Sequence, residues 1–210
     1  MSRDIAMETL WPDMDPGTLG PTFNSMLHRV RKVLEPRTVP GGFDSCILHT
    51  DGVIKLNKEM VQTDVGQLLY HLDTTDRMRS SRKPEDIVGE YEKAFGLYEG
   101  DFLPEDLYSD WAAPMRDRLR IRYLRALEEA AVIAESCGDR DRTLRFYERM
   151  FSADPCNEKA CCWLMTRYHS DARRGEAIRT YERCERALSR DVDLEPDEQT
   201  KKLYRRIIGG

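Results

Sequence analysis

The N-terminal part of the chain carries two stretches in which apolar residues recur at helical spacing. A short helix that stops at Pro12 is predicted by Ile5, Met7, Leu10 and Trp11. Asp15-Pro16 then predicts a second helix, because aspartate caps helix N-termini and proline fits the first helical position. Its apolar side carries Phe23, Leu27, Val30 and Leu34, with Met26 and Val33 alongside, and Pro36 ends it.

A change of pattern follows the Pro40-Gly41-Gly42 loop. Two apolar, β-branched runs flank Asp51-Gly52 within the segment from Ser45 to Leu56. An Asp-Gly pair between such runs is a strong signal for a two-residue hairpin turn. The order helix, longer helix, hairpin is that of the second half of a winged helix.

From Val61 onward the apolar spacing predicts helices throughout. The first contains Leu68, Leu69 and Leu72 and is capped by Thr63 or Asp64, and the polar and basic stretch 74–83 is predicted to be a loop. Pro84-Glu85 begins a helix that contains Ile87, Tyr91, Ala94 and Leu97, and a turn follows at 100–104. Trp111 leads into a long helix through Leu119, Tyr123, Leu127, Ala130 and Ala134 to a stop at Gly138.

A repeat of 34 residues appears in the second half of the chain. The residues Ala130, Ala131, Ala134, Tyr147 and Met150 correspond to Leu164, Met165, Tyr168, Tyr181 and Cys184. Small residues in a first helix, an aromatic residue in a second and Pro155 after it are typical of tetratricopeptide repeats. Because two repeats are fewer than usually stand alone, we expect the upstream helices and a final helix at 200–208 to cap the stack.

Length and charge refine this picture. The chain of 210 residues fits a small unit joined to a larger one, which we place at 1–59 and 60–210. The formal net charge is −5, yet residues 22–37 carry four cations against the single acid Glu35. A local basic stripe on an acidic protein suits contact with phosphates at one place only.

The sequence also restricts the compartment and the chemistry. No apolar run approaches the roughly 18 residues of a membrane span, no signal peptide begins the chain, and the cysteines are too few for a disulfide scaffold. We therefore expect a cytoplasmic protein without membrane contact. Phosphate-loop, nucleophile-elbow and His-Glu-x-x-His motifs are absent, so we expect neither an enzyme nor a cofactor.

Three stretches together resemble the bacterial transcriptional activator domain of antibiotic-regulatory activators. The first is Leu10-Trp11-Pro12-Asp13 leading to the segment from Leu27 to Pro36, which is similar to that family's recognition helix. The second is the segment from Leu97 to Pro104 followed by Trp111, near the family's Tyr-x-Gly-Asp-Phe-Leu-Pro element. The third comprises Asp154-Pro155 through Glu158, then 177–182 and Leu194-Glu195-Pro196.

The resemblance implies a mostly α protein: a tetratricopeptide-like helical repeat array with a small partial winged helix at the N-terminus. The family's winged helix starts with a small antiparallel sheet and a first helix, which have no counterpart before Met1. The winged helix would sit in the major groove of double-stranded DNA. The repeats would relay a signal or contact a protein, either RNA polymerase or a second copy of the chain.

Under that implication the second helix supplies the DNA contacts. Base-facing positions are Thr22, Ser25 and His28, and phosphate-facing positions are Arg29, Arg31, Lys32 and Arg37. In related winged helices the hairpin tip meets the adjacent minor groove, which would place His49, Thr50 and Lys55 nearby. The alternatives are an amphipathic helix whose basic face is merely solvated, and a repeat scaffold of a signalling protein that does not bind DNA itself.

Two other clusters favour structural roles. The arginines of the long helix, Arg116, Arg118, Arg120, Arg122 and Arg125, form no single stripe and are interpreted as a solvated face. Cys156, Cys161, Cys162 and Cys184 lack Cys-x-x-Cys spacing, so buried structural thiols are favoured over a metal site.

Overall fold

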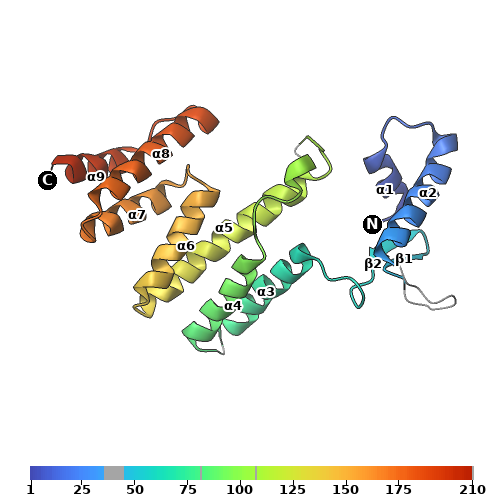
Figure 1. The fold of residues 1–210 in the computed structure, drawn as a ribbon, viewed down its shortest axis with the longest axis horizontal. Coiled ribbons are helices and arrows are strands. Elements are labelled where there is room, and N and C mark those ends of the chain that lie inside the picture. The colour runs from blue at the N-terminus through green and yellow to red at the C-terminus, as the bar shows by residue number, and fades with distance from the viewer. Residues whose placement is uncertain (36–44, 81, 107, 210) are drawn as a thin grey trace.

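The fold is that of a computed structural model, which describes residues 1–35, 45–80, 82–106 and 108–209. Within them the chain forms nine α-helices, one short 3-10 helix and one two-stranded sheet (Figure 1). The elements are α1 (Arg3–Leu10), α2 (Pro16–Leu34), β1 (Ile47–Thr50), β2 (Val53–Leu56), α3 (Asp64–Met78), α4 (Pro84–Gly96), η1 (Pro104–Asp106), α5 (Ala113–Ser136), α6 (Arg140–Ala153), α7 (Glu158–Ser170), α8 (Arg174–Val192) and α9 (Glu198–Gly209). No described helix is both long and apolar enough to cross a membrane.

The N-terminal elements follow the sequence prediction closely. The Asp15 side chain accepts a hydrogen bond from the Gly17 amide at 3.0 Å, and Pro16 opens α2. β1 and β2 pair antiparallel with Thr50 opposite Val53. Asp51 and Gly52 between them both have positive φ, 54° and 71°, as a type I′ turn requires. Both predicted helices and the predicted hairpin are therefore confirmed.

Backbone pairing ties the start of the chain to the hairpin. The Ile54 amide donates to the Met1 carbonyl at 2.9 Å, and the Arg3 amide donates to the Gly52 carbonyl at 2.7 Å. Ser2 bridges to Val53 in antiparallel sense, and its hydroxyl also caps α1. Residues 1–2 thus lie along β2, so that α1, α2 and the hairpin form one small unit, which we call the head (residues 1–56).

The helices from α3 to α9 form an array, and the head lies apart from it beyond a short connecting segment (Figure 1). Consecutive helices pack as the pairs α3–α4, α5–α6 and α7–α8, and α9 closes the array against α7 and α8. All ten positions of the 34-residue register are buried. The repeat prediction and the capping role of the final helix are confirmed.

The predicted loop at 74–83 was wrong for its first five residues, because α3 continues to Met78. Thr75 is only 1% exposed, and its hydroxyl donates to the Leu72 carbonyl at 2.7 Å. A threonine that satisfies its own hydroxyl within the helix can be buried like an apolar residue. Residues 74–78 therefore belong to α3, although their polar composition predicted a loop.

The arginines of α5 also differ from the predicted solvated face. The guanidinium of Arg116 donates to the carbonyls of Phe102, Leu103 and Asp106, and that of Arg120 donates to the Ala153 carbonyl at 2.9 Å. Carbonyls of turns and helix ends lack partners within their own element, and these side chains supply them. The arginines thus fix the loop before α5 and the end of α6. Arg118 is exposed, as expected.

Glu90 is a buried carboxylate that stabilises the α3–α4 pair. It accepts from His71 Nδ1 at 2.6 Å and from Lys93 Nζ at 2.8 Å. Burial alone raises the pKa of Glu90, but the hydrogen bonds from Lys93 and His71 outweigh it and hold that pKa below its usual value. A carboxyl whose folded-state pKa is depressed stabilises the fold above its unfolded pKa, and this contribution is lost as the pH falls through the folded value.

We therefore expect Glu90→Gln to lower the free energy of unfolding at pH 7 by about 1–3 kcal/mol. The difference from the wild-type chain should shrink below about pH 4, where the unfolded carboxyl takes up its proton. Urea titrations between pH 7 and pH 3 measure both. Glu182→Gln, at an exposed position, is the matched control and should change little. A difference that stays constant over this pH range would contradict the assignment.

Candidate nucleic-acid interface

The outward face of α2 carries polar and basic residues at helical spacing. Thr22, Ser25, Arg29 and Lys32 follow one another at intervals of three or four, so they share one side of the helix. Ser25, Arg29 and Lys32 are exposed and Thr22 is half-buried. We call these four residues the outward stripe. His28 is exposed next to it, one turn before Lys32.

The opposite side of α2 packs into the head. Phe23 is buried, with the Arg3 guanidinium 5.6 Å from its ring centroid, and Leu27 and Val30 are half-buried. Leu34, predicted on the same apolar side, is 43% exposed at the helix end, and Val33 is 77% exposed beside the outward stripe. The head therefore orients α2 through a small core and leaves apolar as well as basic groups on the surface.

Arg31 has a different environment from its basic neighbours. It is half-buried, and its Nη2 donates to the Ile47 carbonyl at 2.8 Å, which links α2 to β1. The Glu35 carboxylate adds to this junction by accepting from the Ser45 hydroxyl at 2.8 Å and the Cys46 amide at 2.5 Å. A signal for this was present in the sequence, since Arg31 lies one turn after Leu27 on the apolar side.

The hairpin residues named from the sequence are exposed but do not converge. His49 pairs with Ile54, and Lys55 pairs with Leu48. Because neighbouring positions of a strand point to opposite faces, His49 and Lys55 lie on opposite faces of the hairpin. Thr50 is exposed at the tip. Arg37, like the Pro40-Gly41-Gly42 loop, falls outside the described residues.

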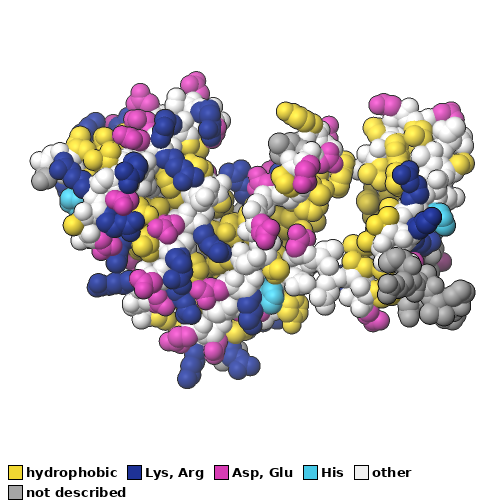
Figure 2. Space-filling model, viewed as in Figure 1, with side chains coloured by type: hydrophobic (Ala, Val, Ile, Leu, Met, Phe, Trp, Pro, Cys, Tyr) yellow, Lys and Arg dark blue, Asp and Glu magenta, His cyan; other side chains and the backbone are white. Residues whose placement is uncertain are grey.

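Electrostatically the outward stripe is available for an anion. Among the described residues every side-chain ion pair lies between positions 71 and 205, so Arg29, Lys32 and Lys55 have no carboxylate partner. Glu35, the acid nearest in sequence, already has two donors. Figure 2 shows Lys, Arg and His side chains close together on one part of the head, with acidic side chains at its end, whereas basic and acidic side chains alternate over the helical array.

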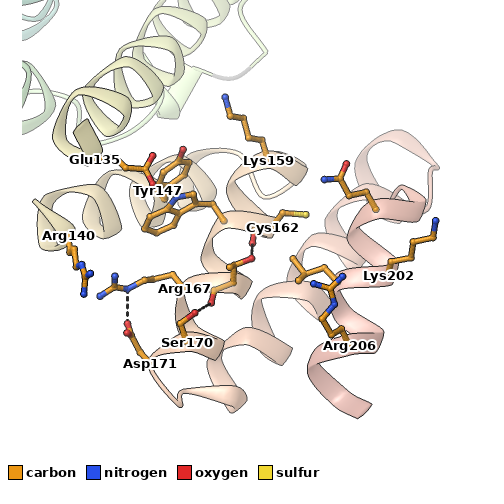
Figure 3. Close-up of a pocket in the computed structure, with 14 residues that line it drawn as sticks. Glu135, Arg140, Tyr147, Lys159, Cys162, Arg167, Ser170, Asp171, Lys202 and Arg206 are labelled. Carbon is orange, nitrogen blue, oxygen red and sulfur yellow. Dashed lines mark hydrogen bonds and ion pairs between the residues drawn. The ribbon is translucent and has the colours of Figure 1, made fainter. Parts of the chain in front are cut away.

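A separate candidate site, a hollow in the surface, lies in the array itself. It is a groove of about 1100 Å³ between α7, α9 and the ends of α5 and α6 (Figure 3). No sequence pattern predicts it, because its lining residues are spread from Glu135 to Arg206 and meet only in the folded stack. Of the four thiols predicted to be buried, Cys161 and Cys184 are buried, whereas Cys156 and Cys162 are half-buried.

Comparison with known proteins adds two matches. A family model described as "Bacterial transcriptional activator domain" matches residues 63–208. The solved structure of Mycobacterium tuberculosis EmbR in complex with a low-affinity phosphopeptide is similar, with a TM-score of 0.67 at 18% sequence identity. That match covers 100% of this chain and 55% of the EmbR chain, so this chain spans about half of that protein. No curated protein matches the chain.

Proposed function

The chain belongs to the bacterial transcriptional activator domain family, and from this premise we propose that it is a regulator that binds double-stranded DNA through its head. In this proposal α2 lies in the major groove, whose width of about 12 Å admits a helix of about 10–12 Å diameter. Residues 1–59 act as the DNA-binding unit, and residues 60–210 present the surface for other macromolecules.

The observation that carries the proposal is the outward stripe with its unpaired cations. Arg29 and Lys32 are exposed and free of carboxylates, so neutralising phosphates costs no existing ion pair. Ser25 and His28, both exposed, lie within one turn before Arg29 and Lys32, at positions from which side chains can reach base edges. We assign base contacts to Thr22, Ser25 and His28, and phosphate contacts to Arg29, Lys32 and Arg37.

The remaining predicted residues take secondary places in this scheme. The hairpin tip, with Thr50 and His49, meets the adjacent minor groove, while Lys55 contacts a phosphate from the other face of the hairpin. Arg31 positions α2 by its bond to the Ile47 carbonyl, and it remains close enough to the stripe to add to its positive potential. These assignments follow from the sequence prediction and from the placement of His49 and Lys55 on opposite faces of the hairpin.

The helical array supplies protein contacts and relays a signal in this proposal. Its partner is RNA polymerase or a second copy of the chain, and the protein works in the cytoplasm. Support comes from the groove, which is open to solvent on a stack of helices. The similar EmbR structure contains a phosphopeptide, a ligand derived from a protein.

A salt-dependent titration tests the DNA proposal. The probe is a labelled duplex of random sequence and about three helical turns, read by fluorescence anisotropy. We expect binding whose log affinity falls linearly with log salt concentration, with a slope of about −3 or steeper from the head's cations. A single-stranded probe of equal length should bind more weakly. An absence of salt-dependent binding to the duplex would remove the basis of the proposal.

The second candidate is a protein-interaction scaffold that does not bind DNA itself. The groove of the array favours it, because such a hollow is a common place for a ligand to bind. The two candidates separate on one result. A scaffold would keep its protein contacts and show no change in DNA affinity when the outward stripe loses its charge.

A further inference from the structure

The groove of the array has a strongly cationic lining. Five basic side chains line it against the two acids Glu135 and Asp171, namely Arg140, Lys159, Arg167, Lys202 and Arg206. Arg167 is paired with Asp171 at 2.7 Å, and Lys159 is paired with Glu128. Arg140, Lys202 and Arg206 have no side-chain partner among the described residues. Three free cations around one hollow favour an anionic occupant.

The groove also has an aromatic side. Tyr147 and Trp163 stack with their ring centroids 4.2 Å apart and an interplanar angle of 13°. Trp163 is half-buried, and its Nε1 donates to Glu135 at 3.4 Å, which fixes the orientation of the indole. A partly exposed, oriented aromatic surface next to guanidinium groups favours an occupant that carries an aromatic side chain as well as acids.

A segment of this chemistry occurs in the chain itself, between α4 and α5. The acidic loop, as we call residues 99–110, contains five acids and no base: Glu99, Asp101, Glu105, Asp106 and Asp110. Among them Glu99, Glu105 and Asp110 have no described partner. Tyr108 in the loop is 99% exposed, the largest exposure of any large hydrophobic residue described. Such a side chain is more typical of an interface than of a free surface.

The acidic loop is held in place over residues 101–106. Arg116 Nε donates to the Phe102 carbonyl at 3.0 Å, and its Nη2 donates to the carbonyls of Leu103 and Asp106 at 3.3 and 3.2 Å. Tyr98 further donates to Asp101 at 3.0 Å. Preorganisation of this kind lowers the entropic cost of binding.

The loop cannot enter the groove of its own molecule. It is clamped to the first turn of α5, whereas the groove lies at the far end of that helix, at Glu135. A helix of 24 residues is about 36 Å long. Any contact between the two surfaces is therefore intermolecular.

We infer that the acidic loop of one copy binds in the cationic groove of a second copy, with Tyr108 against the Tyr147–Trp163 pair. The acids of the loop face Arg140, Lys202 and Arg206 of the second copy. The contact joins two different surfaces. It therefore either closes as a reciprocal dimer or continues as an open chain in which each copy binds the next. The inference does not rest on DNA binding, and either can fail without the other.

Sedimentation velocity from micromolar to near-millimolar concentration tests self-association. We expect the wild-type chain to associate, and to do so less at high salt. Lys202→Glu with Arg206→Glu, the groove variant, and Glu105→Lys with Tyr108→Ser, the loop variant, should each raise the dissociation constant about tenfold or more. All four positions are exposed, and the control for the groove variant, Arg77→Glu with Arg118→Glu, makes the same change of charge elsewhere on the array.

Mixing the two variants gives the sharpest result. The intact loop of the groove variant can enter the intact groove of the loop variant, so the mixture should form heterodimers at concentrations where each variant alone is mostly monomeric. A wild-type chain that stays monomeric, or variants that assemble as it does, would overturn the inference. A chain that stays monomeric although its groove binds a synthetic peptide of residues 99–111 would also overturn it, because the occupant would then be a segment of another protein. A groove variant that loses DNA affinity but still associates would overturn it too, because the occupant would then be a nucleic acid.

Discussion

Replacement of Arg29 and Lys32 together by alanine is expected to weaken duplex DNA binding roughly 30-fold or more at moderate salt. Each cation lies exposed on α2 without a carboxylate partner, so each can contribute about 1–1.5 kcal/mol to a phosphate contact. The loss should be similar for all duplex sequences, because phosphate contacts carry no sequence information. The slope of log affinity against log salt should become less negative by about 2.

The control removes the same charge from the array. Arg77 and Arg118 are exposed there and have no side-chain partner among the residues that the structure describes, so Arg77→Ala with Arg118→Ala changes the net charge equally while leaving the head intact. Anisotropy titrations at several salt concentrations compare the three proteins, and circular dichroism checks the helix content. Equal losses in both double variants would mean that only the total charge matters. An unchanged salt slope in the head variant would refute a phosphate role for α2.

Local sequence signals predicted most of the elements. Asp15-Pro16, Thr63 and Pro84 mark the helix starts that the structure has, and Asp51-Gly52 marks the hairpin turn. These signals work because a cap or a positive-φ position depends on a few neighbouring residues. The 34-residue register was equally informative, since equivalent positions of the two repeats are buried in the same way.

The errors arose where a polar residue takes a role that only tertiary packing reveals. Thr75 is buried in α3, and Arg116 and Arg120 bind carbonyls of other elements. Their polar or charged side chains had indicated exposed positions. Arg31 within the candidate site also makes a tertiary contact that the sequence did not predict, because its Nη2 donates to the Ile47 carbonyl. Charged side chains with long apolar stems can either be solvated or bind a carbonyl of another element.

The groove was beyond sequence reasoning for a different reason. Its cations come from separate helices, and each one alone is an ordinary surface residue. Only the stacking of α7 and α9 against the ends of α5 and α6 brings Arg140, Lys202 and Arg206 around one hollow. The acidic loop, by contrast, is continuous in sequence, but its clamping by Arg116 and the full exposure of Tyr108 appear only in the fold.

Phe95→Ala is expected to lower the free energy of unfolding by about 3–5 kcal/mol, a large part of the about 5–15 kcal/mol typical of a domain. Phe95 is 2% exposed at the junction of three helices. Its ring stacks with Tyr91 at 5.8 Å and makes edge contacts with Tyr123 at 5.6 Å and Phe146 at 5.5 Å. Truncation removes the transfer free energy and three aromatic contacts, and it leaves a cavity whose rigid walls cannot close.

Urea unfolding followed by circular dichroism measures this loss, and Phe95→Leu distinguishes its causes. Leucine keeps most of the buried volume but none of the ring contacts, so it should recover more than half of the lost stability. Tyr108→Ala is the matched aromatic control and should change stability by less than about 0.5 kcal/mol, because that ring is almost fully exposed. Because each repeat contacts only its neighbours, hydrogen exchange should speed up most in α4, α5 and α6. If the free energy of unfolding of Phe95→Ala lies within about 1 kcal/mol of the wild-type value, the three-helix junction is not the centre of the core.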